Sequence, residues 1–483
     1  MSLRQKAVGG MVWTISQQFG VRIISFIVSI ILARLLDPAT FGLFGMISIL
    51  MTLGSTLMDS GLTSSLIRTP NPQQNDFSTV FFINLFGSII IYCLAFFIAP
   101  YVAAFYDQPV LTNIIRVFCT VFIINAFNGI QRARLTIDMN FKAQMMVQVP
   151  SVIIGGIFGI ILAYKGFGVW SLVYMYLMQS TLSTLQFWFG SKWRPNLYFG
   201  RKIFWHHFQF GYKITLSGVI VTLYNNIYTI LIAKYFSASQ LGYYSRALSL
   251  RDMPISNLSA ALNKVTYPIF SAIHNDDAKL KSAYKRVMQQ VVFCIAPLLV
   301  FLVVMAEPFI RILLTEKWLP AVPYFQILCI AGFWLPLQSY NHNIIKVKGN
   351  TGLILKLQIV KKIFGVIGVV SILHFGIIAL LYFHIVSTLV DYLLDAKYGG
   401  GMINYSVWDQ IRDIAPIIFV SIFSGLLIWA VDIFISGNLF NMSDFFRLLV
   451  GVVMYFTVFA LISVKMKIPA LFEFKGMIKK ARV

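Results

Sequence analysis

The sequence predicts an all-α integral membrane protein with about 14 transmembrane helices, and three observations support this prediction. Hydrophobic residues make up 58% of the 483 positions and charged residues 12%, whereas a soluble domain carries about 25% charged residues. Apolar runs of roughly 18 to 25 residues recur along the chain, each long enough to cross about 30 Å of hydrocarbon. A group of positions near the end of the first run also recurs about 200 residues later. The short alternating strands of a membrane barrel are absent, which leaves helices to satisfy the backbone in lipid.

We expect spans at residues 9–34, 41–66, 78–100, 110–130, 144–164, 167–190, 208–234, 241–268, 286–306, 320–342, 352–373, 376–394, 411–436 and 444–465. Connections between them are short, so we expect no sizeable soluble domain. We assign residues 1–200 to an N-terminal bundle of spans 1–6 and residues 201–400 to a C-terminal bundle of spans 7–12. Residues 401–483 form an additional helical pair and a basic cytoplasmic tail.

The repeat links the two bundles. Its matching positions are Ala33, Arg34, Phe41, Gly42 and Phe44 in the first copy, and Ala233, Lys234, Leu241, Gly242 and Tyr244 in the second. Each set closes one apolar run and opens the next, so the same two-helix unit begins both bundles. Two equal lobes of this kind around a central cavity are the ground plan of an alternating-access transporter.

Charge sets the expected topology. The formal net charge is +22, and most of the 39 Lys and Arg residues fall in the loops of one side. This bias follows the positive-inside rule, so we expect both termini in the cytoplasm and no nucleic-acid partner. The basic N-terminus resembles a signal peptide. However, the run after it is long, contains Arg22 and lacks a small-residue cleavage site, so we expect a first span rather than a leader.

Signatures of enzymes, metals and cofactors are missing. The sequence contains no GxxxxGK[ST] loop, no HExxH and no paired-Cys zinc spacing. The four cysteines fall inside predicted spans without paired spacing, and we interpret them as free thiols. A many-span polysaccharide polymerase or ligase usually carries a large periplasmic loop. The longest one expected here, residues 307–319, is short, so we expect no enzyme.

Ionisable groups inside spans are costly unless they face water or a partner, which makes them candidates for function. Arg22 lies near the middle of the first span, on one helical face with Gln18 and Ser25. The second span also has one polar face, made of Ser48, Thr52, Ser55, Thr56, Asp59 and Thr63. The candidate cations of a central cavity are Arg22, Lys213, Arg246 and Arg251. A guanidinium suits phosphate because its donors form a planar fork.

Other polar residues complete the predicted cavity. Tyr224, Asn225 and Tyr228 suit sugar rings, although interfacial aromatics are an equal alternative. Asp59 and Asp252 are weak candidates for ion coupling. Ser and Thr stripes also serve helix packing, and ion pairs such as Arg22 with Asp59 or Arg246 with Asp252 are the structural alternative. We interpret Arg116, Asp391, Asp432 and Arg447 as structural.

Two segments resemble a known family. These are ARLLDPATFGLF at residues 33–44, with the preceding helix WTISQQFGVRIISFIVSIILAR, and GYYSRALSLRDMP at residues 242–254. They resemble bacterial oligosaccharide flippases of the Wzx type, which belong to the MOP superfamily with the multidrug/MATE exporters and the lipid II flippases. The resemblance covers essentially the whole chain, and the nearest subgroup is the colanic-acid exporters among the lipopolysaccharide-biosynthesis proteins.

The resemblance implies an inner-membrane exporter of oligosaccharide repeat units on undecaprenyl diphosphate, working in extracellular polysaccharide biosynthesis. It implies a lipid-linked oligosaccharide as substrate, and membrane lipids, a polysaccharide polymerase and glycosyltransferases as partners. Members of the family use cavity arginines for the anionic headgroup, a role that Arg22, Arg246 and Arg251 would fill here. A MATE-like multidrug or cation antiporter on the same fold is the alternative, and it would need essential carboxylates.

Overall fold

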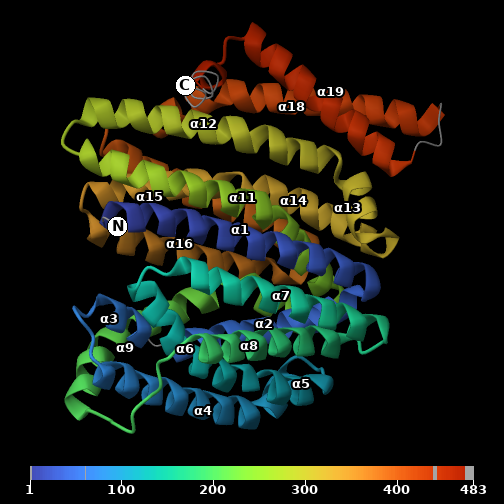
Figure 1. Cartoon of the computed structure of the whole chain (residues 1–483). Helices are drawn as coiled ribbons and strands as arrows, with labels where there is room; N and C mark the ends of the chain where they lie inside the picture. The colour runs from blue at the N-terminus through green and yellow to red at the C-terminus, as the bar shows by residue number, and fades with distance from the viewer. Residues whose placement is uncertain (1–2, 60, 439–442, 474–483) are drawn as a thin grey trace. The chain divides into compact units, whose positions relative to one another are not determined.

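The computed structural model describes residues 3–59, 61–438 and 443–473, with side chains throughout except at 3–12, 15, 59, 257–265 and 435–438. The described residues form helices joined by short connections and contain no strand (Figure 1). The prediction of an all-α membrane protein is therefore confirmed. Contacts divide the chain into two compact units, Met1–Gly242 and Tyr243–Val483. The three-part division at residues 200 and 400 stays a prediction.

Ten α-helices lie within the first unit. They are α1 (Leu3–Leu35), α2 (Pro38–Asp59), α3 (Leu62–Arg68), α4 (Gln74–Phe105), α5 (Val110–Phe118), α6 (Thr120–Ile137), α7 (Phe141–Tyr164), α8 (Val169–Gly190), α9 (Arg201–Asn225) and α10 (Ile227–Tyr235). Helix α11 (Ala238–Ala272) begins at the end of this unit and continues into the second. In the first unit, α7 contacts both α1 and α8, and α9 contacts α2, α3 and α4.

The second unit continues with eight α-helices and three short segments of other helix types. They are α12 (Asp277–Val304), α13 (Ala306–Leu314), η1 (Glu316–Ala321), α14 (Val322–Gly332), α15 (Trp334–Val347), α16 (Thr351–Ile372), η2 (Leu373–Phe375), α17 (Ile377–Asp395), η3 (Ala396–Gly400), α18 (Val407–Asn438) and α19 (Asp444–Lys465). Helix α12 packs against α18, which packs against α19 (Figure 1).

Within the described residues, ten helical segments are long and apolar enough to span a membrane, and α9 with α10 makes an eleventh, bent by 49°. Three further helices coincide with predicted spans: α8, α11 and α16, of 22, 35 and 22 residues. They are long enough to span a membrane, but α8 and α11 are rich in polar residues, and α16 carries three lysines, Lys356, Lys361 and Lys362. The chain is thus a multi-pass membrane protein, while the count of 14 and the cytoplasmic termini stay predictions.

The repeated glycines have a structural cause. A Cβ on Gly42 would lie 1.8 Å from the carbonyl oxygen of Ala238, and one on Gly242 would lie 1.9 Å from that of Pro38. The two contacts mirror each other: each glycine meets the residue that lies 200 positions from the one met by the other glycine, since 38 matches 238 and 42 matches 242. The first turn of α2 therefore crosses the first turn of α11 backbone to backbone. Only glycine fits at both positions.

A second pair of matching features lies at the start of two helices. Helices α7 and α16 both begin after an asparagine, Asn140 and Asn350, whose side-chain oxygen accepts from the N–H three residues on at 3.1 Å. Their backbones agree closely, with φ and ψ of −90° and 66° at Asn140 and −89° and 68° at Asn350. An asparagine N-cap satisfies a free donor of the first turn. Helices α7 and α16 thus begin in the same way, 210 positions apart.

Small residues bring helices of the first unit close together. On α7, a Cβ at Gly156 would meet Val28 of α1 at 2.6 Å, and one at Gly159 would meet Met175 of α8 at 2.8 Å. Helices in lipid associate through such close packing, since burial of apolar surface drives them little. These contacts fix α7 between α1 and α8.

Candidate functional site

A polar cavity of about 720 Å³ lies within the first unit. It is lined by α2, α3, α4, α6, α7, α8 and α9. Its polar side chains are neutral except for one: Ser55, Thr56, Thr63, Ser64, Asn84, Asn125, Asn128, Arg132, Thr136, Gln148, Ser183 and Thr215. Arg132 is thus the one charged residue that lines the cavity in the part of the chain with described side chains.

The short helix α3 closes one side of the cavity. Gly61, just before it, has φ of +63°, and a Cβ there would lie 2.8 Å from the Cα of Gly211 on α9. A left-handed conformation beside a neighbouring backbone requires glycine. Ser65 of α3 then shares a 2.8 Å hydrogen bond with the buried Nδ1 of His207 on α9. These contacts hold α3 against α9, and both helices line the cavity.

Amide side chains form much of the cavity wall. Asn128 donates to the hydroxyl of Thr184 at 3.0 Å. Gln148 accepts from the buried Gln17 of α1 at 2.6 Å. The Oδ1 atom of Asn84 is buried and has no hydrogen-bond partner among the described residues. Buried amides without a full set of partners favour ligands rich in donors and acceptors. The wall therefore suits hydroxylated molecules such as sugars.

Arg132 gives the cavity its charge. It lies on α6, its side chain is exposed, and its guanidinium makes no ion pair with a described residue. Arg134, two residues on, stacks instead over the rings of Phe77 and Trp193, at 5.6 and 6.0 Å from the ring centroids. The cavity therefore offers a cation together with neutral hydrogen-bonding groups, a combination that suits an anionic carbohydrate.

The predicted residues of the first unit lie mostly elsewhere. From the predicted polar face of the second span, Ser55, Thr56 and Thr63 line the cavity. The exposed side chains of Arg22, Gln18 and Ser25 lie on α1, outside this lining. Lys213 lies 5.9 Å from the ring centroid of Tyr212. The side chain of Asp59 falls outside the described residues.

Tyr224, Asn225 and Tyr228 flank the break between α9 and α10. At the break, the side chain of Asn226 donates to the carbonyl oxygen of Thr222 at 2.8 Å. The Thr222 hydroxyl lies 3.4 Å from that of Thr56, a cavity residue. Broken helices are frequent at transporter binding sites. Tyr224 thus lies two residues from Thr222, which contacts the cavity residue Thr56, and Tyr228 lies beyond the break on α10.

Arg251 is the most buried of the predicted cations. Its side chain, in the second unit, is 5% exposed and donates to Asp252 from Nε at 2.9 Å and from Nη2 at 2.6 Å. Its buried Nη1 has no hydrogen-bond partner among the described residues. Gly332 makes room for it, because a Cβ there would lie 2.7 Å from the Cδ of Arg251. Asp252 thus forms an ion pair with Arg251. Arg246 is half-buried and lies five residues before Arg251 on α11.

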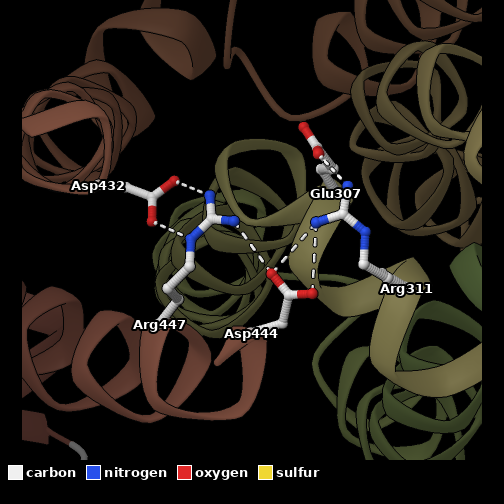
Figure 2. A network of polar contacts seen from close by, with 5 residues as sticks. All are labelled: Glu307, Arg311, Asp432, Asp444 and Arg447. Atoms are coloured by element: carbon white, nitrogen blue, oxygen red, sulfur yellow. Dashed lines mark hydrogen bonds and ion pairs between the residues drawn. The ribbon is translucent and has the colours of Figure 1, made fainter. Parts of the chain in front are cut away.

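Arg447 and Asp432 belong to a network of ion pairs in the second unit (Figure 2). Arg447 bonds Asp432 at 2.7 and 3.0 Å and Asp444 at 3.0 Å. Asp444 also accepts from Arg311 at 3.3 Å, and Arg311 donates to Glu307 at 2.7 Å. The network joins α13, α18 and α19, which explains the charges as packing contacts.

The charge of Arg311 is fixed by this network. Burial alone would lower its pKa. The hydrogen bonds and charges of Asp444 and Glu307 outweigh that effect and raise the pKa above its ordinary value. Residues 307–319, expected as a loop, lie mostly in α13 (Ala306–Leu314) and η1 (Glu316–Ala321) instead.

Sequence reasoning missed one buried ion pair. Lys361 of α16 bonds Asp395 of α17, and both side chains are 5% exposed. Lys361 lies beside Lys362 and near Lys356 on α16, and Asp395 follows Asp391 on α17, so no pattern in the sequence marks these two residues as partners. No group of three or more His, Cys, Asp or Glu side chains lies close enough to hold a metal ion in the described ranges.

Comparison with known proteins identifies the family. Residues 31–323 match the polysaccharide biosynthesis protein family. The lipopolysaccharide biosynthesis protein WzxC of Escherichia coli is 24% identical over 75% of this chain and 74% of its own length. The teichuronic acid biosynthesis protein TuaB of Bacillus subtilis is 21% identical over 73% of each chain. The succinoglycan biosynthesis transport protein ExoT of Rhizobium meliloti is 23% identical over 68% of this chain and 67% of its own.

Two solved structures share the fold. The lipid II flippase MurJ in an inward closed conformation superposes with a TM-score of 0.75 at 14% identity, over 94% of this chain and 99% of that one. An inward-facing multidrug resistance transporter of the MATE family superposes with a TM-score of 0.61 at 15% identity, over 80% and 96%. The match to WzxC confirms the predicted resemblance to Wzx-type proteins, and the chain belongs to the polysaccharide biosynthesis protein family.

Proposed function

We propose that this protein is a flippase that moves oligosaccharide units, linked to undecaprenyl diphosphate, across the bacterial inner membrane for polysaccharide biosynthesis. The observation that carries the proposal is the cavity of the first unit. Its wall combines neutral hydroxyl and amide groups with the guanidinium of Arg132. Hydroxyls and amides match sugar hydroxyls, and a guanidinium matches phosphate. The names of WzxC, TuaB and ExoT, which all refer to polysaccharide biosynthesis, support the same substrate class.

The charge balance of the cavity argues against a cationic drug as substrate. A cationic substrate is bound by carboxylates or by the faces of aromatic rings, because an uncompensated charge is costly to desolvate. No carboxylate lines this cavity among the side chains that the structure describes. A drug antiporter on this fold is therefore the weaker proposal.

In the proposed mechanism, the two lobes rock and expose the substrate alternately to each side of the membrane. Arg22 of the first unit and Arg251 of the second supply further cations for the diphosphate, whose lost hydration they replace. Asp59 and Asp252 serve ion coupling. The protein performs no covalent chemistry, and it works with the polymerase and glycosyltransferases of its pathway.

Transport by the purified full chain tests the proposal. The chain is reconstituted in liposomes with an undecaprenyl-diphosphate oligosaccharide, and the amount that reaches the opposite leaflet is measured. We expect Arg132→Ala to lower the rate by at least about tenfold, because a hydrogen bond to a charged group contributes about 1.5–3 kcal/mol. Lys165→Ala, at an exposed cation outside the cavity, is the control. Equal rates for Arg132→Ala and the control would reject the cavity as the site of transport.

A further inference from the structure

Residues 191–200 form a fixed strap between α8 and α9. Four hydrogen bonds tie the segment to the start of α4. The indole Nε1 of Trp193 donates to the side-chain oxygen of Gln74 at 2.6 Å. The N–H of Asn196 donates to Ser78 at 3.0 Å, and the N–H of Gly200 donates to Thr79 at 3.2 Å. The side chain of Gln74 donates to the carbonyl oxygen of Arg194 at 2.7 Å. The strap therefore has a defined shape, although it lacks regular secondary structure.

An apolar groove of about 650 Å³ lies between the strap, α4 and α9. Its walls include Phe82, Phe86, Ile90, Leu197, Phe199 and Phe204. Leu197 is 97% exposed and Phe86 67% exposed, so these side chains contact few others of the chain. At 1.5 Å per residue, Phe86 lies about 18 Å and Ile90 about 24 Å from the first residue of α4. The groove thus extends from the end of the helix well into its apolar length.

Aromatic rings continue the groove along α9. The rings of Phe199 and Phe204 lie 6.0 Å apart, those of Phe204 and Phe208 5.2 Å, and those of Phe208 and Tyr212 5.7 Å. The last three residues are spaced four apart and share one helical face. Phe208 and Tyr212 are exposed. The rings form a track about 12 Å long from Phe204 to Tyr212.

The strap end of the groove is basic. Lys192, Arg201 and Lys202 are exposed there, and residues 191–204 contain no Asp or Glu. The nearest acid on α4 is Asp76, whose carboxylate accepts from the N–H of Gln73 at 2.7 Å. The anionic head of an amphiphile would therefore contact the cations of the strap, and its apolar chain would lie in the groove.

We propose that this groove binds the polyprenyl chain of a polyprenyl diphosphate lipid, which rests on the proposed function. Helix α4 lines both the groove and the polar cavity: Phe82 and Phe86 face the groove, and Asn84 faces the cavity. Helix α9 does the same through Phe204 and Thr215. The apolar chain stays on the lipid side of these helices, and the polar head reaches the other side. The strap cations bind the diphosphate as it arrives from the membrane.

Binding of sugar-free polyprenyl diphosphate to the purified full chain, measured by native mass spectrometry, tests this site. Phe86→Ala is compared with Phe97→Ala, which lies three turns along the same face of α4, is 71% exposed and does not line the groove. We expect Phe86→Ala to weaken binding about tenfold, since a buried aromatic ring contributes about 1.5–3 kcal/mol, and Phe97→Ala to leave it unchanged. Phe199→Ser, on the exposed strap, repeats the test if Phe86→Ala unfolds.

Two results would overturn the site. In one, Phe86→Ala and Phe199→Ser bind like Phe97→Ala. In the other, phosphatidylglycerol at equal concentration displaces the ligand, which would make the groove a site for bulk lipid. Transport by the unaltered chain separates the two proposals. If the unaltered chain transports the lipid and the groove variants bind it normally, only the groove is rejected. If the unaltered chain shows no transport and no binding, the flippase proposal itself is rejected.

Discussion

Arg251 shows how one buried charge divides its hydrogen bonds. Its Nε and Nη2 atoms bond Asp252, and its buried Nη1 has no partner among the described residues. A buried cation whose donors are partly unused is costly to the fold. In our proposal, the free Nη1 donor of Arg251 binds the diphosphate of the substrate, which offsets this cost.

A double variant separates substrate binding from ion pairing at Arg251. We expect Arg251→Ala to lower export at least tenfold, because the proposed diphosphate contact is lost. Removing Arg251 alone also leaves Asp252 without its partner, so Asp252→Asn is added to remove that charge. The proposal predicts that the double variant folds normally and still fails to export in the liposome assay. Recovery of export in the double variant would show that Arg251 serves only to neutralise Asp252.

At the scale of helices, the crossing of α2 and α11 depends on two glycines. We expect Gly42→Ala and Gly242→Ala to destabilise the protein by similar amounts, each about 1–3 kcal/mol, because either methyl group would overlap a carbonyl oxygen. Thermal unfolding in detergent measures the effect. Gly87→Ala on α4 is the matched control: a Cβ there meets nothing within 4 Å, so we expect no loss of stability. A tolerated alanine at position 42 would contradict the close crossing.

The ion-pair network fastens the last two helices to α13 (Figure 2). We expect Arg447→Ala to lower the unfolding free energy by about 3–5 kcal/mol, because it leaves Asp432 without its ion-pair partner in a half-buried site, whereas Asp444 keeps Arg311. The double variant Arg447→Met with Asp432→Leu should lower the unfolding free energy clearly less, since it replaces one ion pair by apolar side chains. Thermal unfolding of both variants checks this difference, and equal losses would mean that charge compensation is not what the network contributes.

For the whole molecule, apolar runs and the 200-residue spacing were sufficient to predict the helical membrane fold and its repeated pair. The spacing identified Gly42 and Gly242, but their role became clear only when Pro38 and Ala238 were seen beside them. Asn140 and Asn350 escaped the sequence comparison because capping depends on backbone conformation, which a single asparagine does not specify.

The cavity was less predictable than the fold. Helical spacing predicted one polar face that includes Ser55, Thr56 and Thr63. All three line the cavity, but α2 ends at Asp59, so Thr63 lies on the separate helix α3. Nothing in the sequence singles out Arg132, because it follows the predicted span 110–130 and a basic residue at the end of a span usually reports orientation. Its position in the cavity depends on how α6 packs against α3 and α8, which are distant in sequence. Periodicity describes one helix and carries no information on such neighbours.

The most direct test of the flippase proposal is the location of lipid-linked oligosaccharides in cells that lack this gene but keep the glycosyltransferases. The amount of undecaprenyl-diphosphate oligosaccharide is quantified, and its side of the inner membrane is determined. The account predicts that complete repeat units accumulate on the cytoplasmic side and that the intact gene, but not its Arg132→Ala form, relieves the accumulation. Complete units that reach the periplasm at the normal rate without this protein would contradict it.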